Sequence, residues 1–276
     1  KAENRLYIVK SMDTSYSLSA QIKSVPNDSF KYARTTVVNM HDKTEIFTVR
    51  LPSIPHQIPL FILFRALGVE SDKEILEYIL YELDSEKAQL FMDTLLPTIE
   101  NNWNVFTQSE AIKYLAQLTL GNTTSHLMNI IESDVFPHIG DDFNHKAYYL
   151  GHTVHKILNV HFKIEQSTDR DSFIYKRVDL SGFLLASLFR ESFKQFLRDT
   201  KIAIDTEYRF NASKYVDDKF ANVVNEDNMR TIFNQSTIEN MFMKSFKIGT
   251  ILNKKGLIQL MNRLSSSGAI SHLRRI

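Results

Sequence analysis

A proline-rich segment, LPSIPHQIP at residues 51–59, divides the chain into two patterns and so restricts the folds open to it. Proline lacks a backbone N–H and disfavours helix at the residue before it, so the segment suits neither a central strand nor a helix interior. Before it, runs rich in Val, Ile, Tyr and Thr alternate with Ser, Asp and Asn, which predicts β-strands. These strands are expected at 5–10, 17–25, 33–40 and 45–51, with a hairpin around Asp42 and Lys43.

The pattern after this segment is helical. Pro59 suits the first turn of a helix over 60–67, which Gly68 ends. Further helices are predicted at 72–83, 85–98, 109–120, 127–136, 145–162 and 180–204. Two pairs have the spacing of a capping box: Ser71 with Glu74, and Thr107 with Glu110. A short antiparallel β segment followed by a mostly helical region, then mixed segments, predicts an α+β fold.

The composition excludes several kinds of site. None of the 276 residues is cysteine, which rules out disulfides, cysteine-bound metals and thiol nucleophiles, and fits a reducing compartment. Hydrophobic residues make up 43% of the chain, enough for an ordinary globular core. No apolar run reaches the length of a membrane span. The first residue is Lys1 rather than Met, so we expect a piece of a longer polypeptide.

Charge is distributed unevenly along a chain whose net charge is only +1. Residues 71–100 carry eight acids and two lysines, whereas residues 241–276 carry seven basic residues and no acid. Such unopposed cations favour a partner made of phosphates over the alternative of a merely solvated basic surface. A flexible Ser/Gly loop is expected at 265–268, beside these cations. The basic residues expected to contact nucleic acid are Lys254, Lys255, Arg263, Arg274 and Arg275.

Four histidines within 17 residues suggest a metal site. His145, His152, His155 and His161, with Asp141 or Asp142, offer nitrogen and oxygen ligands for zinc, iron or manganese. Against this, no known ligand spacing such as His-Glu-x-x-His occurs, and histidines on a helix mostly contact solvent or backbone. A metal-dependent hydrolase using His145, His152, His155 and Asp141 is therefore an alternative hypothesis. A stand-alone nucleic-acid-binding module is another.

Four separated stretches carry a family resemblance. They are IPLFILFRALG (58–68) with SDKEIL (71–76), KAYYLG (146–151), DRDSF (169–173) with KRVDLSG (176–182), and QLMNRL (259–264) through SHLRR (271–275). In this order they resemble the second-largest subunit of multisubunit DNA-directed RNA polymerases, the counterpart of the bacterial β subunit. The first stretch is most similar to the eukaryotic messenger-RNA polymerase or its relative in large nucleocytoplasmic DNA viruses. Departures at Ser172, at Tyr175 and at 265–270 favour a viral or otherwise fast-evolving source.

The resemblance implies an architecture and a role. Residues 1–162 would be the lobe domain, 163–231 part of the protrusion domain, and 232–276 a truncated fork. The fragment would bind and guide DNA and the RNA–DNA hybrid without holding a catalytic residue, a metal or a cofactor. The catalytic Mg²⁺ would be held by the largest subunit, which with other polymerase subunits would be its partner. No membrane is expected. The location would be the nucleus if the source is cellular, or the virion, host cytoplasm or viral factory if it is viral.

Overall fold

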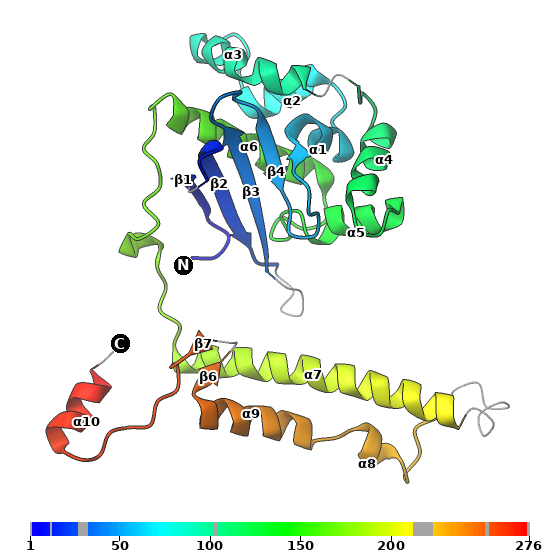
Figure 1. The fold of residues 1–276 in the computed structure, drawn as a ribbon, viewed down its shortest axis with the longest axis vertical. Helices are drawn as coiled ribbons and strands as arrows, with labels where there is room; N and C mark the ends of the chain where they lie inside the picture. Colours follow the sequence, from blue (N-terminus) through cyan, green and yellow to red (C-terminus); the bar gives the residue numbers. More distant parts are fainter. Residues whose placement is uncertain are drawn as a thin grey trace. The chain divides into compact units, whose positions relative to one another are not determined.

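The computed structural model describes residues 2–11, 13–26, 33–101, 104–211, 223–251 and 254–274. It divides into two compact units, Lys1–Arg177 and Val178–Ile276, which are described here one at a time (Figure 1). The first unit contains a five-stranded antiparallel sheet and a set of helices packed on it. The second contains a pair of long helices, a small hairpin and a short C-terminal helix. The predicted α+β class is confirmed.

The sheet of the first unit follows the order of the chain. Its strands are β1 (Leu6–Lys10), β2 (Tyr16–Ser24), β3 (Arg34–His41), β4 (Phe47–Arg50) and β5 (Ile58–Pro59). The predicted hairpin is confirmed, since Met40 pairs with Phe47 and Val38 with Val49. Those four side chains are buried, because alternate residues of a strand face the same side of the sheet. Pro59 lies in the edge strand β5, where its missing N–H breaks no ladder.

In the described part of the first unit, six helices accompany the sheet. They are α1 (Leu60–Ala66), α2 (Asp72–Leu80), α3 (Glu86–Glu100), α4 (Gln108–Leu118), α5 (Thr124–Ser133) and α6 (Phe143–His161). The longest, α6, packs across β1, β2 and β3, and α2 packs on α6 (Figure 1). The helix expected over 72–83 ends earlier, because Tyr81 takes a left-handed φ of 67°. The helix expected over 127–136 begins at Thr124, where Thr123 accepts a hydrogen bond from the His126 backbone N–H.

The two predicted capping boxes have different outcomes. The Thr107 side chain accepts from the Glu110 N–H at 3.4 Å, and the Glu110 carboxylate accepts from the Thr107 N–H at 3.2 Å, so that box is confirmed. The Phe106 and Thr107 backbone N–H groups, which both donate to the Glu110 carboxylate, hold its pKa below the usual range. The box at Ser71 is wrong: Ser71 is the N-cap of α2, but its side chain makes no capping bond. The neighbouring Asp72 instead pairs with Arg65.

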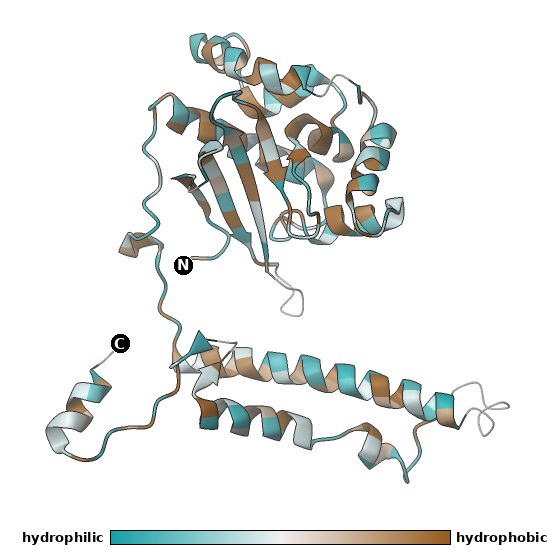
Figure 2. Ribbon diagram, viewed as in Figure 1, coloured by the Kyte–Doolittle hydropathy of each residue, from teal (hydrophilic) through white to brown (hydrophobic). Residues whose placement is uncertain are grey.

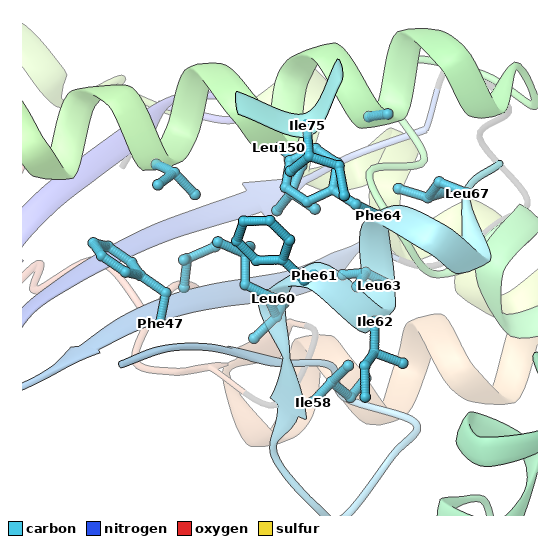
Figure 3. Packing of buried hydrophobic residues seen from close by; sticks show 14 of the residues in the cluster. Phe47, Ile58, Leu60, Phe61, Ile62, Leu63, Phe64, Leu67, Ile75 and Leu150 are labelled. Carbon is cyan, nitrogen blue, oxygen red and sulfur yellow. The ribbon is translucent and has the colours of Figure 1, made fainter. Parts of the chain in front are cut away.

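Helix α1 lies at the centre of the core. All seven of its residues are buried, and Leu60, Phe61, Leu63 and Phe64 are fully so. Figure 3 shows its side chains among those of Phe47, Ile75 and Leu150, which come from β4, α2 and α6. Gly68 follows the helix with a φ of 101°, a conformation that L side chains rarely adopt. The predicted helix and its glycine stop are confirmed.

One charge is buried with this helix. The Arg65 guanidinium donates to the Asp72 carboxylate at 2.5 Å and to the Val105 carbonyl oxygen, and its Cζ lies 5.5 Å from the Phe106 ring centre. A buried ion without partners would cost several kcal/mol, so these contacts are what make the burial of Arg65 tolerable. They also join α1 to the start of α2 and to the segment before α4.

Helices α2 and α6 approach closely at a glycine. A Cβ added at Gly151 of α6 would overlap the backbone carbonyl of Tyr78 in α2. The obstacle is backbone rather than the end of a flexible side chain, so it cannot turn away. Gly151, the last residue of the KAYYLG stretch, therefore sets the spacing of these helices.

We predict that Gly151→Ala lowers the free energy of unfolding of the first unit by about 1–3 kcal/mol, the usual cost of overpacking a core. Urea unfolding followed by circular dichroism would measure it. Gly182→Ala is the matched control, because its added Cβ meets no atom within 4 Å and should leave that transition unchanged. An unchanged midpoint for Gly151→Ala would show that α2 and α6 can separate at no cost.

The segment after α6 belongs to the first unit through its backbone contacts. The Thr168 N–H donates to the Ile8 carbonyl at 2.7 Å, and the Ala2 N–H donates to the Tyr175 carbonyl at 2.8 Å. A 3₁₀ turn at Phe173–Tyr175 precedes the end of the unit at Arg177. The compact unit thus continues past residue 162, because this segment lies along the outer edge of β1. The assignment to lobe, protrusion and fork stays a prediction.

The second unit is built on two helices that pack side by side, α7 (Ser181–Phe210) and α9 (Ser236–Ile248). The short α8 (Met229–Ile232) precedes α9, and β6 (Thr250–Ile251), β7 (Lys254–Lys255) and α10 (Ser266–Leu273) follow it. The helix predicted over 180–204 is confirmed and is longer. Apolar positions recur along it (Figure 2), yet Phe183, Phe189 and Leu197 remain about half exposed.

Candidate nucleic-acid interface

Two of the predicted contact residues lie together on a tight hairpin. Helix α9 ends at Gly249, whose φ is 74°, and the chain then forms β6 and β7, with Thr250 opposite Lys255. The hairpin closes where the Gly256 N–H donates to the Gly249 carbonyl at 3.0 Å. Lys254 and Lys255 are both exposed, and neither has an ion-pair partner among the described residues.

Glycine is required at the base of this hairpin. The left-handed φ of Gly249 is one reason, and a crossing of the chain is the other: a Cβ there would lie 2.5 Å from the Ile258 carbonyl oxygen. Lys247, in the last turn of α9, is placed where a cation offsets the partial negative charge of a helix C-terminus. The hairpin therefore places Lys254 and Lys255 beside the C-terminal end of α9, whose partial negative charge Lys247 already offsets.

Arg263 lies on a segment organised by a histidine. The Asn262 backbone N–H donates to His272 Nδ1 at 3.1 Å, so the ring proton is on Nε2, which donates to the Gln259 side-chain oxygen at 3.1 Å. The Asn262 side chain in turn accepts from the Leu264 N–H at 3.0 Å. These bonds fix the backbone on both sides of Arg263, whose side chain is exposed.

The flexible Ser/Gly loop predicted at 265–268 is wrong. Ser265 is the N-cap of α10, and its hydroxyl accepts from the Gly268 N–H at 3.1 Å, which starts a helix through residues expected to be loop. Arg274 is the C-cap of this helix and is exposed. Arg275 lies outside the described residues. The structure thus brings Lys254 and Lys255 together on one hairpin. Arg263 lies in the segment before α10, and Arg274 lies at the C-terminal end of that helix.

A buried lysine is the residue that sequence reasoning missed. Lys146 is fully buried, and its ammonium donates to the carbonyls of Ile131 and Glu132 at 2.8 and 2.7 Å, at the end of α5. The last carbonyls of a helix lack partners within it, so Lys146 acts as a C-cap supplied by another helix. The signal was a lone cation within a largely apolar stretch, KAYYLG. Lys146 therefore has a structural role within this stretch.

In the third recognisable stretch, residues 169–173 with 176–182, the side chains mainly contact other residues of the same segment. Lys176 pairs with Asp171 at 3.6 Å, and the Asp171 N–H donates to the Asp169 carboxylate at 2.9 Å. The Arg177 guanidinium donates to the carbonyls of Ile174 and Lys176 at 3.0 and 2.8 Å. These contacts stabilise the turn that ends the first unit.

The four histidines of the possible metal site have four different partners. His145 pairs with Asp142 at 2.6 Å, His152 with the Tyr81 hydroxyl at 2.8 Å and His155 with the Ile79 carbonyl at 2.9 Å, while His161 is 3.8 Å from Glu45. Within the part of the chain that the structure describes, no three His, Cys, Asp or Glu side chains are grouped to hold a metal. The hydrolase hypothesis is therefore not favoured. The expectation that the chain needs no cofactor stays a prediction.

Burial lowers the pKa of His152 and His155, and the nearby Lys156 lowers both further. Burial also lowers the pKa of His138. The folded chain then binds fewer protons than the unfolded chain once the pH falls below about 6.5, the ordinary histidine value. We predict that the free energy of unfolding is highest above that pH. It should decrease as the pH falls below it, towards the lowered pKa values of these histidines.

The measurement is the urea midpoint between pH 7.5 and 5. His152→Gln should flatten the decline, whereas His126→Gln, which changes an exposed histidine, should leave it as it is. A midpoint that does not fall below pH 6.5 would contradict the assignment of these histidines as neutral in the fold.

Comparison with known proteins gives the class to which this fold belongs. Residues 2–179, which are the first unit except Lys1 and two residues beyond it, match the family model described as "RNA polymerase Rpb2, domain 2". The chain therefore belongs to the RNA polymerase Rpb2 domain 2 family, and the predicted resemblance to second-largest polymerase subunits is confirmed.

Curated relatives extend the similarity across both units. The chain is 32% identical to the DNA-directed RNA polymerase II subunit RPB2 of Encephalitozoon cuniculi, over 100% of this chain and 24% of that protein. It is 27% identical to subunit Rpo2 of Saccharolobus shibatae, over 100% of this chain and 23% of that protein. It is 28% identical to DNA-directed RNA polymerase subunit 2 of Acanthamoeba polyphaga mimivirus, over 84% of this chain and 22% of that protein. The chain spans about a quarter of their length. In the described part of the chain no helix is both long and apolar enough to cross a membrane.

Proposed function

We propose that this chain is part of the second-largest subunit of a DNA-directed RNA polymerase, and that its second unit contacts phosphates of the template DNA and of the RNA–DNA hybrid. Its membership of the Rpb2 family and the names of its eukaryotic, archaeal and viral relatives support the first part. The second part is supported by the charges of the second unit.

The observation that carries the proposal is the acid-free segment 241–276. Four of its cations, Lys254, Lys255, Arg263 and Arg274, are exposed and have no ion-pair partner among the described residues. Cations that are neither paired nor buried can contact phosphate without breaking a bond in the fold. Phosphate contacts release condensed counterions, which makes the binding favourable and salt-dependent.

The finer roles follow from the family resemblance. Residues 1–162 serve as lobe, 163–231 as part of the protrusion and 232–276 as fork. The chain guides nucleic acid and supplies no catalytic residue, while the largest subunit holds the catalytic Mg²⁺. Its partners are that subunit and the other polymerase subunits. A cellular enzyme would work in the nucleus, and a viral one in the virion or the host cytoplasm.

The hairpin lysines provide the test. In the assembled polymerase, replacing Lys254 and Lys255 together by Ala should reduce the salt slope of template–transcript binding by about two, since each phosphate contact contributes roughly 0.9. Arg263→Ala and Arg274→Ala should each reduce it by about one. The measurement is retention of a labelled template–transcript scaffold across a series of salt concentrations, with the unfolding midpoint recorded for each variant.

Lys113→Ala is the control, because Lys113 is an exposed lysine of α4 in the first unit. It should leave both the slope and the midpoint unchanged. Equal slopes for the control, the lysine pair and the arginines would contradict the nucleic-acid contact. A lowered midpoint with an unchanged slope would instead assign the residue to folding or subunit assembly.

A further inference from the structure

A shallow, open groove lined by tyrosines and histidines lies on the first unit, whereas the proposed nucleic-acid contacts belong to the second. Its volume is about 590 Å³, and its lining residues are Tyr81, Ile139, His145, Tyr148, Tyr149 and His152. We call this the tyrosine groove. Tyr81 follows α2 and the others except Ile139 lie on α6, so the close approach of these two helices at Gly151 creates it.

Two aromatic faces of the tyrosine groove are open to solvent. Tyr81 and Tyr148 are each 53% exposed. Tyr148 stacks on Tyr78 with ring centres 4.1 Å apart, and the Tyr81 hydroxyl is held by His152, so both rings have fixed positions. Tyr149 is more deeply placed, and burial raises its pKa to about 12. Rigid, exposed rings contribute little to the stability of the fold, but they suit a flat or cationic group stacked on them.

The charges beside the stacked Tyr78 and Tyr148 rings, at one side of the tyrosine groove, are acidic. Burial and the neighbouring Tyr148 raise the pKa of Tyr78, and Glu74 and Glu77 lie close enough to raise it further. Asp142 pairs with His145 at the other side. The segment 71–100, which contains α2, carries eight acids and two lysines.

The nearby cations are already bound within the fold. Lys156 pairs with Glu165 at 2.7 Å, Lys146 caps α5, and Lys73 lies 4.0 Å from Glu77. Glu74 of α2, which acts on Tyr78, is exposed and has no ion-pair partner among the described residues, so the tyrosine groove combines exposed rings with an unpaired carboxylate beside them. Nucleic acid would meet repulsion here, whereas a cationic side chain would be attracted twice, by the rings and by the acids.

We propose that the tyrosine groove is a docking site for an arginine-bearing peptide segment of a partner protein. The guanidinium is flat, remains charged at any physiological pH and is weakly hydrated, so it can stack on Tyr148 while its N–H groups reach Glu74, which lies beside the stacked Tyr78. Lysine, a compact and strongly hydrated charge, would gain less from the rings. This inference does not depend on the proposed nucleic-acid contacts of the second unit.

The test uses the full chain and a fluorescent peptide of alternating glycine and arginine, followed by anisotropy. Binding should be tighter than for the matched lysine peptide, and the matched glutamate peptide should not bind. Tyr148→Leu keeps apolar bulk but removes the ring, and should weaken arginine-peptide binding about two- to fivefold. Glu74→Gln removes one charge while keeping the length of the side chain, and should weaken binding further when combined with Tyr148→Leu.

Tyr114→Leu is the control, since Tyr114 is a 38% exposed tyrosine of α4 that does not line the groove. It should bind the peptide as the unaltered chain does. Equal affinity in the Tyr148→Leu and Tyr114→Leu variants would overturn the proposal. So would a thymidine oligonucleotide that binds in a Tyr148-dependent way, or self-association of the chain that Tyr148→Leu abolishes, because these results would assign the groove to nucleic acid or to a second copy.

Discussion

The burial of α1 is the constraint on which the first unit depends. A helix whose seven residues are all buried is stable only inside a shell, so the sheet and the helices around it have to form with it. Its one charge adds a condition, because Arg65 must meet Asp72 and the Val105 carbonyl at the same time. The first recognisable stretch thus joins the end of the sheet, α1 and the beginning of α2 through one packed and charge-neutral centre.

The other recognisable stretches of the first unit have structural roles of the same kind. Gly151 allows α2 to approach α6, and Lys146 in the same stretch caps α5 from the side. The turn with Asp171 and Lys176 binds its own backbone and closes the unit. The similarity to polymerase subunits is therefore carried in this unit by residues that fix the architecture. Tyr148, an exposed residue of the same stretch as Gly151 and Lys146, lines the tyrosine groove that we propose as a docking site.

The second unit differs in how its basic residues are held. Lys254 and Lys255 depend on the glycine turn at Gly249, and Arg263 depends on the bonds that His272 makes to its neighbours. Each is a local arrangement of a few hydrogen bonds, with most side chains exposed. Few buried contacts oppose local rearrangement in such segments, so they can adjust to a bound backbone more readily than the packed first unit.

The sequence alone determined the class of fold, the four main strands, the order of the helices and the family. These follow from local properties: the two-residue alternation of strands, the helical spacing of apolar residues, the prolines of 51–59 and the glycine after α1. The acid-free segment 241–276 likewise predicts a candidate nucleic-acid interface from charge alone. The sequence does not determine contacts between distant residues, or which of several possible partners a side chain meets.

Only the tertiary structure decided those features. At the start of α2 the predicted Ser71 box is absent and Asp72 pairs with the distant Arg65, and the loop at 265–268 became helix because Ser265 caps it. The four histidines look like a ligand set along the chain, yet each has a separate partner in space. Lys146 is buried because its ammonium meets the last carbonyls of α5, a partner that the sequence does not show. In every case the sequence shows which polar and charged groups are present. The packing of helices and strands decides which partner each buried or hydrogen-bonded group meets.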